Sequence, residues 1–343
     1  MEHRVRLVID PLRKESVTLS LPLAFRRSLE ETRAQLGLSA AVDLSDPVVA
    51  KAVALAGLAH GRSPAVRFAL FGGTAHRFSC PVSNDPVLGL RHDLHDLDVA
   101  VLLKEVREFQ RFLLAAPEEG GSGLTFFETS GDRIYNSLSG GQRLRWHMAV
   151  AEHSSEVVLG TLDIVADSFQ FCHRIDLRSD VEHAASRAWT LSPAHLLLAK
   201  GQFIRRVPKE DSALVAERVL EPFGKRDVVI GPEPKDVRDI LAVLHDHPIG
   251  EGPGEVSLTE LAGALSGDWG LWKTFGLNLG MVARSRILQS LPPAARERIL
   301  PRLRAVRDLV AGAAPKRPFS LFGGPWWQEV DSTPSVDSTV AVD

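Results

Sequence analysis

The chain has 343 residues, of which 44% are hydrophobic and 24% charged, and its formal net charge is −3. This length is typical of about two domains, and the composition is that of an ordinary globular protein. The near-neutral charge excludes a global attraction to nucleic acid or anionic membranes, so such a contact would need a local basic patch. The two cysteines, Cys80 and Cys172, exclude a disulfide framework and a thiolate zinc centre.

The N-terminal sequence MEHRVRLVID is charged throughout, and no apolar run reaches the roughly 18 residues of a membrane span. We therefore expect a cytoplasmic protein without a membrane partner.

The first half of the chain alternates between strand-like and helix-like patterns of apolar residues. We expect strands at 4–9, 66–71 and 96–103, and helices at 21–36, 47–58, 75–83 and 104–115. Four further β-like segments follow at 124–128, 143–151, 157–166 and 172–177. These elements predict an α/β domain over residues 1–190, with a helical extension at its N-terminus.

After about residue 190 the pattern changes to helices. Ser192 and Pro193 are an N-cap and a first-turn proline, and Ser257-x-x-Glu260 is a capping box. The expected helices are 193–206, 234–245, one that begins after Ser257, 268–291 and 293–311. They form a helical domain over residues 191–312, so the fold class is α+β with a mixed sheet followed by helices.

Residues 313–343 are rich in Pro and Gly at first and then lack any core-forming pattern, so we expect a flexible, disordered tail. Its aromatic side chains are predicted to dock either on the body of the protein or on a partner. They are Phe319, Phe322, Trp326 and Trp327.

The chemistry-bearing part of the sequence lies between residues 66 and 101. A strand-like run ends at Gly72-Gly73-Thr74, and Asp96 and Asp98 are two residues apart within the next strand. Because residues i and i+2 of a strand share a face, the two carboxylates point the same way. Magnesium prefers such oxygen donors, and a Gly-Gly turn allows the backbone to approach a phosphate. Asp163, within another apolar run, is the best candidate for a third carboxylate.

These motifs resemble the nucleotidyltransferases of the DNA polymerase β-like superfamily, in which a GG[ST] turn precedes an hDhDh strand and a third Asp follows. The layout is most similar to the AbiEii-type branch, which includes the MenA-like toxins of bacterial toxin–antitoxin pairs. In that branch a helical domain carries a Lys in an "LsP…aK" helix and a later "[RK]DxxDh" helix. Here LSPAHLLLAK contains Lys200, and KDVRDI contains Asp236 and Asp239.

The resemblance, over roughly residues 64–246, implies a role for each motif. Asp96 and Asp98 would bind Mg²⁺ or Mn²⁺, and Asp163 would be a third ligand or the base for the acceptor hydroxyl. Residues 72–74 (Gly72, Gly73 and Thr74) would hold the triphosphate of the NTP. Lys200 would neutralise phosphate charge, and Asp236 or Asp239 would orient Lys200 or the nucleotide.

Each motif also has a purely structural interpretation. Gly72-Gly73 can be a simple turn, and Asp96 and Asp98 the solvated face of an edge strand. Asp167 competes with Asp163, and Lys200 can extend along an amphipathic helix to solvent. Asp236 and Asp239 can be first-turn acids that favour the helix dipole. His92 and His95 flank the acidic pair, but an HxxH pair without further ligands is a weak zinc signal.

The resemblance leads us to expect a magnesium-dependent nucleotidyltransferase that moves NMP to a hydroxyl, with RNA and specifically the tRNA 3′ end as acceptor. It would be the toxin of a type IV toxin–antitoxin pair, with a cognate antitoxin as partner. Two alternatives remain: a small-molecule acceptor, as in antibiotic adenylylation, or a non-catalytic nucleotide- or partner-binding protein. Basic residues that could contact RNA are Arg205, Arg206, Lys209, Lys225, Arg226, Lys235 and Arg238, with a second set between 296 and 307.

Overall fold

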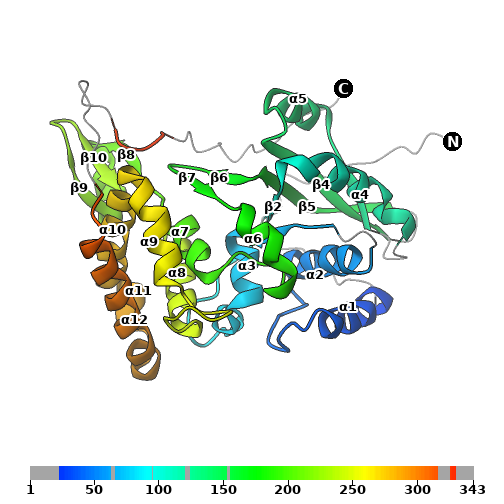
Figure 1. Cartoon of the computed structure of the whole chain (residues 1–343), viewed down its shortest axis with the longest axis horizontal. Coiled ribbons are helices and arrows are strands. Elements are labelled where there is room, and N and C mark those ends of the chain that lie inside the picture. The colour runs from blue at the N-terminus through cyan, green and yellow to red at the C-terminus, as the bar shows by residue number, and fades with distance from the viewer. Residues whose placement is uncertain are drawn as a thin grey trace.

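The computed structural model of the chain describes residues 23–62, 66–94, 96–119, 124–152, 155–315 and 325–329 (Figure 1). The strand expected at residues 4–9 and most of the expected tail lie outside these residues.

A five-stranded mixed sheet occupies the first half of the chain, with strand order β1-β2-β5-β4-β3. Within it β2 and β5 run parallel, whereas the other neighbouring pairs are antiparallel. Alternating apolar residues such as Leu97, Val99 and Ile164 are buried and hold the sheet against the helices. The expected α+β class with a mixed sheet is therefore confirmed. The strands are β1 (Ala69–Phe71), β2 (Leu97–Val101), β3 (Leu124–Phe127), β4 (Arg143–Glu152) and β5 (Ser155–Ala166).

Six α-helices accompany this sheet in the described residues. α2 begins where the Asp46 carboxylate accepts hydrogen bonds from the N–H groups of Val48 and Val49. α5 and α6 are absent from the sequence prediction, although the Thr129–Asp132 capping box that starts α5 is readable in the sequence. The helices are α1 (Leu23–Gln35), α2 (Pro47–His60), α3 (Gly72–Ser79), α4 (Val106–Glu119), α5 (Ser130–Leu138) and α6 (Arg178–His183). Short 3₁₀ helices are η1 (Pro81–Asn84), η2 (Leu103–Glu105) and η3 (Ala184–Ser186).

Helices dominate the second half of the chain, as expected, and α9, α10 and α12 lie together at the left of Figure 1. The predicted N-caps Ser192 and Ser257 are present, because the Ser192 hydroxyl accepts from the N–H of His195 and the Ser257 hydroxyl from that of Glu260. The carboxylate of Glu260, which a capping box would direct at the N-cap, instead lies 3.2 Å from His195. One cluster of buried apolar side chains extends from Leu29 to Val310, so both halves share a core. The helices are α7 (Pro193–Gly201), α8 (Pro234–Asp246), α9 (Leu258–Gly267), α10 (Trp269–Arg284), α11 (Arg286–Ser290) and α12 (Pro293–Gly312).

The second half also contains three strands, β8 to β10, that the sequence analysis did not predict. The helix expected over 193–206 ends at Gly201, where any larger side chain would overlap the ring of Phe275. The β-branched run at 228–230 then favours a strand. It forms the centre of a three-stranded antiparallel sheet of order β8-β10-β9. Its strands are β8 (Arg205–Pro208), β9 (Val219–Phe223) and β10 (Asp227–Ile230), and η4 (Lys209–Arg218) connects β8 to β9. In the first half, the β-like segment expected at 172–177 contains β7 (Arg174–Asp176), which pairs with the unpredicted β6 (Ser168–Gln170).

Residues 325–329 lie on the body of the protein, which is a departure from the flexible tail expected there. Trp327 is 5% exposed, and its ring lies 5.4 Å from that of Phe223. The N–H of Gln328 donates a hydrogen bond of 2.9 Å to the carbonyl of Cys172. The tail aromatics were expected to dock either on the body of the protein or on a partner. Trp326 and Trp327 dock on the body of the protein.

Replacing Trp327 by Ala tests whether this docking stabilises the fold. We expect a loss of about 3 kcal/mol in the free energy of unfolding, because a buried aromatic ring is removed from an apolar cluster. Leu214→Ala is the matched control, since Leu214 is 87% exposed and its loss should cost less than about 0.5 kcal/mol. Urea unfolding of both variants measures the difference, and equal small losses would contradict docking.

Candidate nucleotide and metal site

The register of two neighbouring strands brings the predicted carboxylates together. β2 and β5 are parallel, and Asp98 is paired directly with Asp163. Paired residues of adjacent strands project from the same face of the sheet. Asp96 lies next to this pair, because its Oδ1 accepts a hydrogen bond of 2.5 Å from the hydroxyl of Thr161 on β5. The structure thus places Asp98 and Asp163 on one face of the sheet and Asp96 close to the same two strands.

Asp167, the alternative candidate for the third carboxylate, uses its side chain to hold the backbone instead. It follows the end of β5 with a φ of 58°. Its Oδ1 accepts a 2.8 Å hydrogen bond from the N–H of Leu103. This bond fixes the exit of the chain from β2, so the geometry favours Asp163 over Asp167.

The Gly72-Gly73 turn lies against the acidic pair. Gly72 has a φ of +65°, which L-residues with side chains rarely adopt, and a Cβ there would overlap the carboxylate of Asp98. α3 begins at this residue, and no side chain caps its first turn. The N-terminal N–H groups of a helix lack intrahelical partners and favour anions. Thr74 is buried, and its hydroxyl donates a 3.4 Å hydrogen bond to the carbonyl of Asp96.

The charge of Asp98 is costly in this environment. Burial raises the pKa of Asp98 to about 7, and the negative charges of Asp163 and Asp96 act in the same direction. The positive charge of Lys200 opposes this rise. A carboxyl group that is destabilised by neighbouring carboxylates is favourably placed to accept a cation.

Asp163 is already paired with an arginine, which the sequence analysis did not foresee. Arg145 on β4 donates from Nε to Oδ1 of Asp163 at 2.8 Å and from a terminal nitrogen to Oδ2 at 3.1 Å. This two-point pair fixes the orientation of the carboxylate. Each carboxylate oxygen retains a second lone pair, so Asp163 can still accept a ligand while Arg145 holds it.

The predicted lysine and the two acids of α8 form a second, buried cluster. Nζ of Lys200 lies 3.1 Å from Oδ1 of Asp236 and 2.8 Å from Oδ2 of Asp239. Burial opposes the charge on Lys200, but Asp239 and Asp236 outweigh it and raise its pKa. Burial likewise opposes the charge on Asp239, but His76 and Lys200 outweigh it and lower its pKa well below its usual range. Both predicted acids therefore orient Lys200.

Two histidines connect this cluster to the glycine turn. His92 Nε2 lies 2.8 Å from Oδ1 of Asp239, and its ring lies against Gly73. The Nδ1–H of His76 donates to the carbonyl of Gly72 at 2.7 Å, and this nitrogen lies 3.9 Å from Asp239. The position of α3 relative to α7 and α8 is therefore fixed through side chains that surround Asp239.

The segment between α3 and β2 is anchored along its length. The N–H of Val82 donates to Oδ2 of Asp246 at 2.8 Å, and Nε of Arg238 donates to the carbonyl of Gly89 at 3.1 Å. Arg77, only 2% exposed, donates to the carbonyls of Ser83 and His92. The long segment between the Gly72-Gly73-Thr74 turn and Asp96 is thus held against α8, and it positions His92.

Sequence reasoning missed the roles of four side chains of this site, each for a specific reason. Thr161 is two residues before Asp163 on the same strand face, so the i, i+2 rule was sufficient to find it. Arg145 requires the β4–β5 register. His92 requires the tertiary contact with α8. Lys51 of α2 is buried near Asp96; burial lowers its pKa to about 8, while the charges of Asp46 and Asp96 oppose this change.

The donor set suits a hard divalent cation, because carboxylate oxygens are the ligands that Mg²⁺ prefers. A metal ion needs ligand atoms that lie close together. In the described part of the chain, Asp180, His195 and Glu260 form a group whose possible ligand atoms all lie within 4.8 Å of one another. Asp96, Asp98 and Asp163 do not form such a group there. A bound ion would therefore draw these three carboxylates closer together.

Comparison with known proteins does not indicate a function. No family model matches the chain, and no curated protein is significantly similar to it. Within the described residues, none of the helices is both long and apolar enough to cross a membrane.

The raised pKa of Asp98 predicts a pH-dependent effect of Asp98→Asn. The unfolded chain loses this proton near pH 4, whereas the native protein retains it up to about pH 7. The native state therefore binds more protons in this window, and stability falls as the pH rises through it. The amide of the Asp98→Asn variant carries no charge and removes this penalty. The variant should therefore gain on the order of 2 kcal/mol relative to wild type at pH 8 and much less at pH 4.5.

Denaturant unfolding in EDTA at the two pH values measures this gain. The control is Asp93→Asn, because Asp93 is exposed and its replacement should have the same small effect at both pH values. A gain for Asp98→Asn that does not change with pH would contradict the electrostatic account.

Proposed function

We propose that this protein is a magnesium-dependent nucleotidyltransferase that transfers NMP from an NTP to a hydroxyl acceptor and releases pyrophosphate. The observation that carries the proposal is the pairing of Asp98 with Asp163 on parallel strands, with Gly72 of α3 against the Asp98 carboxylate. Phosphoryl and nucleotidyl transfer require positioned phosphates, divalent cations and an aligned hydroxyl, which is what such an arrangement supports.

The proposed roles follow the position of each group. Asp96 and Asp98, with Asp163 beside them, would hold Mg²⁺ or Mn²⁺, whose chemistry is to neutralise and align the phosphate oxygens. The first N–H groups of α3, at Gly72, Gly73 and Thr74, would receive the triphosphate.

Lys200 would contribute positive charge near the phosphates. Its ammonium group is held by Asp236 and Asp239, which supports an orienting role for these acids. Asp163, whose orientation is fixed by Arg145, would accept the proton of the acceptor hydroxyl or serve as a third ligand.

For the acceptor we favour RNA, with the tRNA 3′ end as the specific substrate of a toxin-like enzyme that a cognate antitoxin would control. The supporting observation is the exposure of five basic residues on and around the β8-β10-β9 sheet. These side chains could contact an RNA backbone even though the net charge of the chain is −3. A small-molecule acceptor needs no such contact. The exposed basic residues are Arg205, Arg206, Lys209, Lys225 and Arg226.

Incubation of the purified protein with each labelled NTP, Mg²⁺ and total RNA tests the reaction. We expect one NTP to label RNA, and the double replacement of Asp96 and Asp98 by Ala to reduce labelling at least about 100-fold, because the metal ligands are lost. Asp93→Asn, the exposed neighbour, should retain activity. Equal labelling by the double variant would overturn the catalytic assignment, and no labelling of any acceptor would favour a non-catalytic binding protein.

The salt dependence of the same reaction distinguishes the two acceptor classes. With RNA, the apparent affinity for the acceptor should fall steeply between about 50 and 200 mM salt, and Arg205→Ala with Arg206→Ala should flatten that slope. A small-molecule acceptor would show neither effect.

A further inference from the structure

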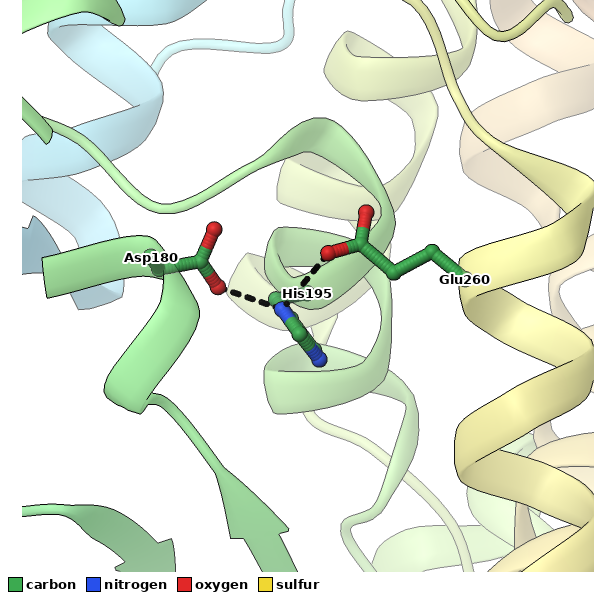
Figure 2. Close-up of side chains that lie close together, drawn as sticks. All are labelled: Asp180, His195 and Glu260. Carbon is green, nitrogen blue, oxygen red and sulfur yellow. Dashed lines mark hydrogen bonds and ion pairs between the residues drawn. The ribbon is translucent and has the colours of Figure 1, made fainter. Parts of the chain in front are cut away.

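Three helices bring a histidine and two carboxylates together away from the proposed nucleotide site. Asp180 lies on α6, His195 on α7 and Glu260 on α9, and Figure 2 shows the imidazole nitrogen between the two carboxylates. Nδ1 of His195 makes a hydrogen bond with Oδ2 of Asp180 and lies 3.2 Å from Oε1 of Glu260. One possible ligand atom from each residue lies within 4.8 Å of those of the other two.

The carboxylate of Asp180 is oriented by a second layer of contacts. Asp180 is fully buried, and its Oδ1 accepts hydrogen bonds from Arg187 at 2.7 Å and from the N–H of Ser192 at 2.9 Å. Its other oxygen is thereby directed at His195. Protein metal sites characteristically have such outer contacts, which fix the ligand and leave one oxygen for the ion.

The other side of the cluster faces a cavity. His195 and Glu260 line a hollow of about 810 Å³, whose wall also includes Arg174, Arg178 and Asp268. This hollow provides the entry path that a metal site requires. It also means that three protein ligands leave coordination positions open to water or to an anion.

The donor set distinguishes between classes of cation. An imidazole nitrogen with two carboxylates suits first-row transition ions such as Zn²⁺ or Mn²⁺, whereas Mg²⁺ prefers oxygen ligands alone. Metal–ligand bonds of about 2.0 to 2.2 Å place the ligand atoms of a tetrahedral ion roughly 3.3 to 3.5 Å apart. The separation of 3.2 Å between His195 and Glu260 is close to this value. Nδ1 of His195 and Oδ2 of Asp180 lie closer together than this. When the ion takes the place of the proton between them, that proton passes to solvent and the distance between the two atoms increases.

We propose that Asp180, His195 and Glu260 bind one divalent first-row transition-metal ion, with its open positions facing the cavity between α6, α7 and α9. This site is separate from the Mg²⁺ site of the proposed function, since none of its ligands belongs to that set. The ion would link three helices that belong to different parts of the sequence.

Isothermal titration calorimetry with Zn²⁺ tests the site. It uses the full chain, from which EDTA has first removed bound metal. The Asp98→Asn variant is the parent protein, so that the proposed nucleotide site does not contribute. We expect one equivalent of Zn²⁺ to bind in the presence of excess Mg²⁺. His195→Ala and, separately, Glu260→Gln should weaken binding at least about tenfold.

Two controls make the result decisive. His183→Ala removes an exposed histidine of α6 outside the cluster and should leave zinc binding unchanged. Glu260→Gln preserves the size of a partly exposed side chain, so it tests the ligand even if His195→Ala does not fold. The absence of a stoichiometric zinc site in the parent, or equal affinity in all variants, would overturn the proposal. Because binding is read without activity, this outcome is independent of nucleotidyl transfer.

Discussion

The in-register pairing of β2 with β5 is the constraint on which the candidate site depends. It sets Asp98 opposite Asp163, while β1 on the other side of β2 delivers the chain to Gly72. A shift of one residue in this register would place the two carboxylates on opposite faces of the sheet. The buried positions Leu97, Val99 and Ile164 prevent that shift, because they would lose their core contacts. Apolar packing therefore positions the polar site.

The charges around this pair are balanced by elements far apart in the sequence. Arg145 holds Asp163 from one side, and Lys200 lowers the cost of ionising Asp98 from the other. Lys200 is itself held by Asp236 and Asp239, and His92 and His76 connect Asp239 to the start of α3. Replacing Lys200 would leave two buried or nearly buried carboxylates without their cation, so a change at this position affects stability as well as chemistry.

Local signals predicted the elements well, and tertiary contacts account for the omissions. Alternation and caps located the five strands of the main sheet and the starts of α7 and α9, and the i, i+2 rule predicted Asp96 and Asp98 on one face. The β8-β10-β9 sheet was missed because its short strands lie between helical patterns. Gly201, the last residue of α7, packs closely against Phe275, which lies far along the chain in α10. Arg145, Lys51 and His92 join the site only through strand register and helix packing. The Asp180–His195–Glu260 cluster has no spacing signal, because its members lie on three helices.

The most direct test of the paired carboxylates as metal ligands measures Mn²⁺ binding by electron paramagnetic resonance, in the presence of a non-hydrolysable NTP analogue. The account predicts that Asp98→Asn and Asp163→Asn each weaken nucleotide-dependent Mn²⁺ binding at least about tenfold. Asp167→Asn should not, because that side chain accepts a hydrogen bond from the N–H of Leu103 and fixes the exit of the chain from β2. Unchanged binding in Asp98→Asn and Asp163→Asn, or a loss confined to Asp167→Asn, would contradict it.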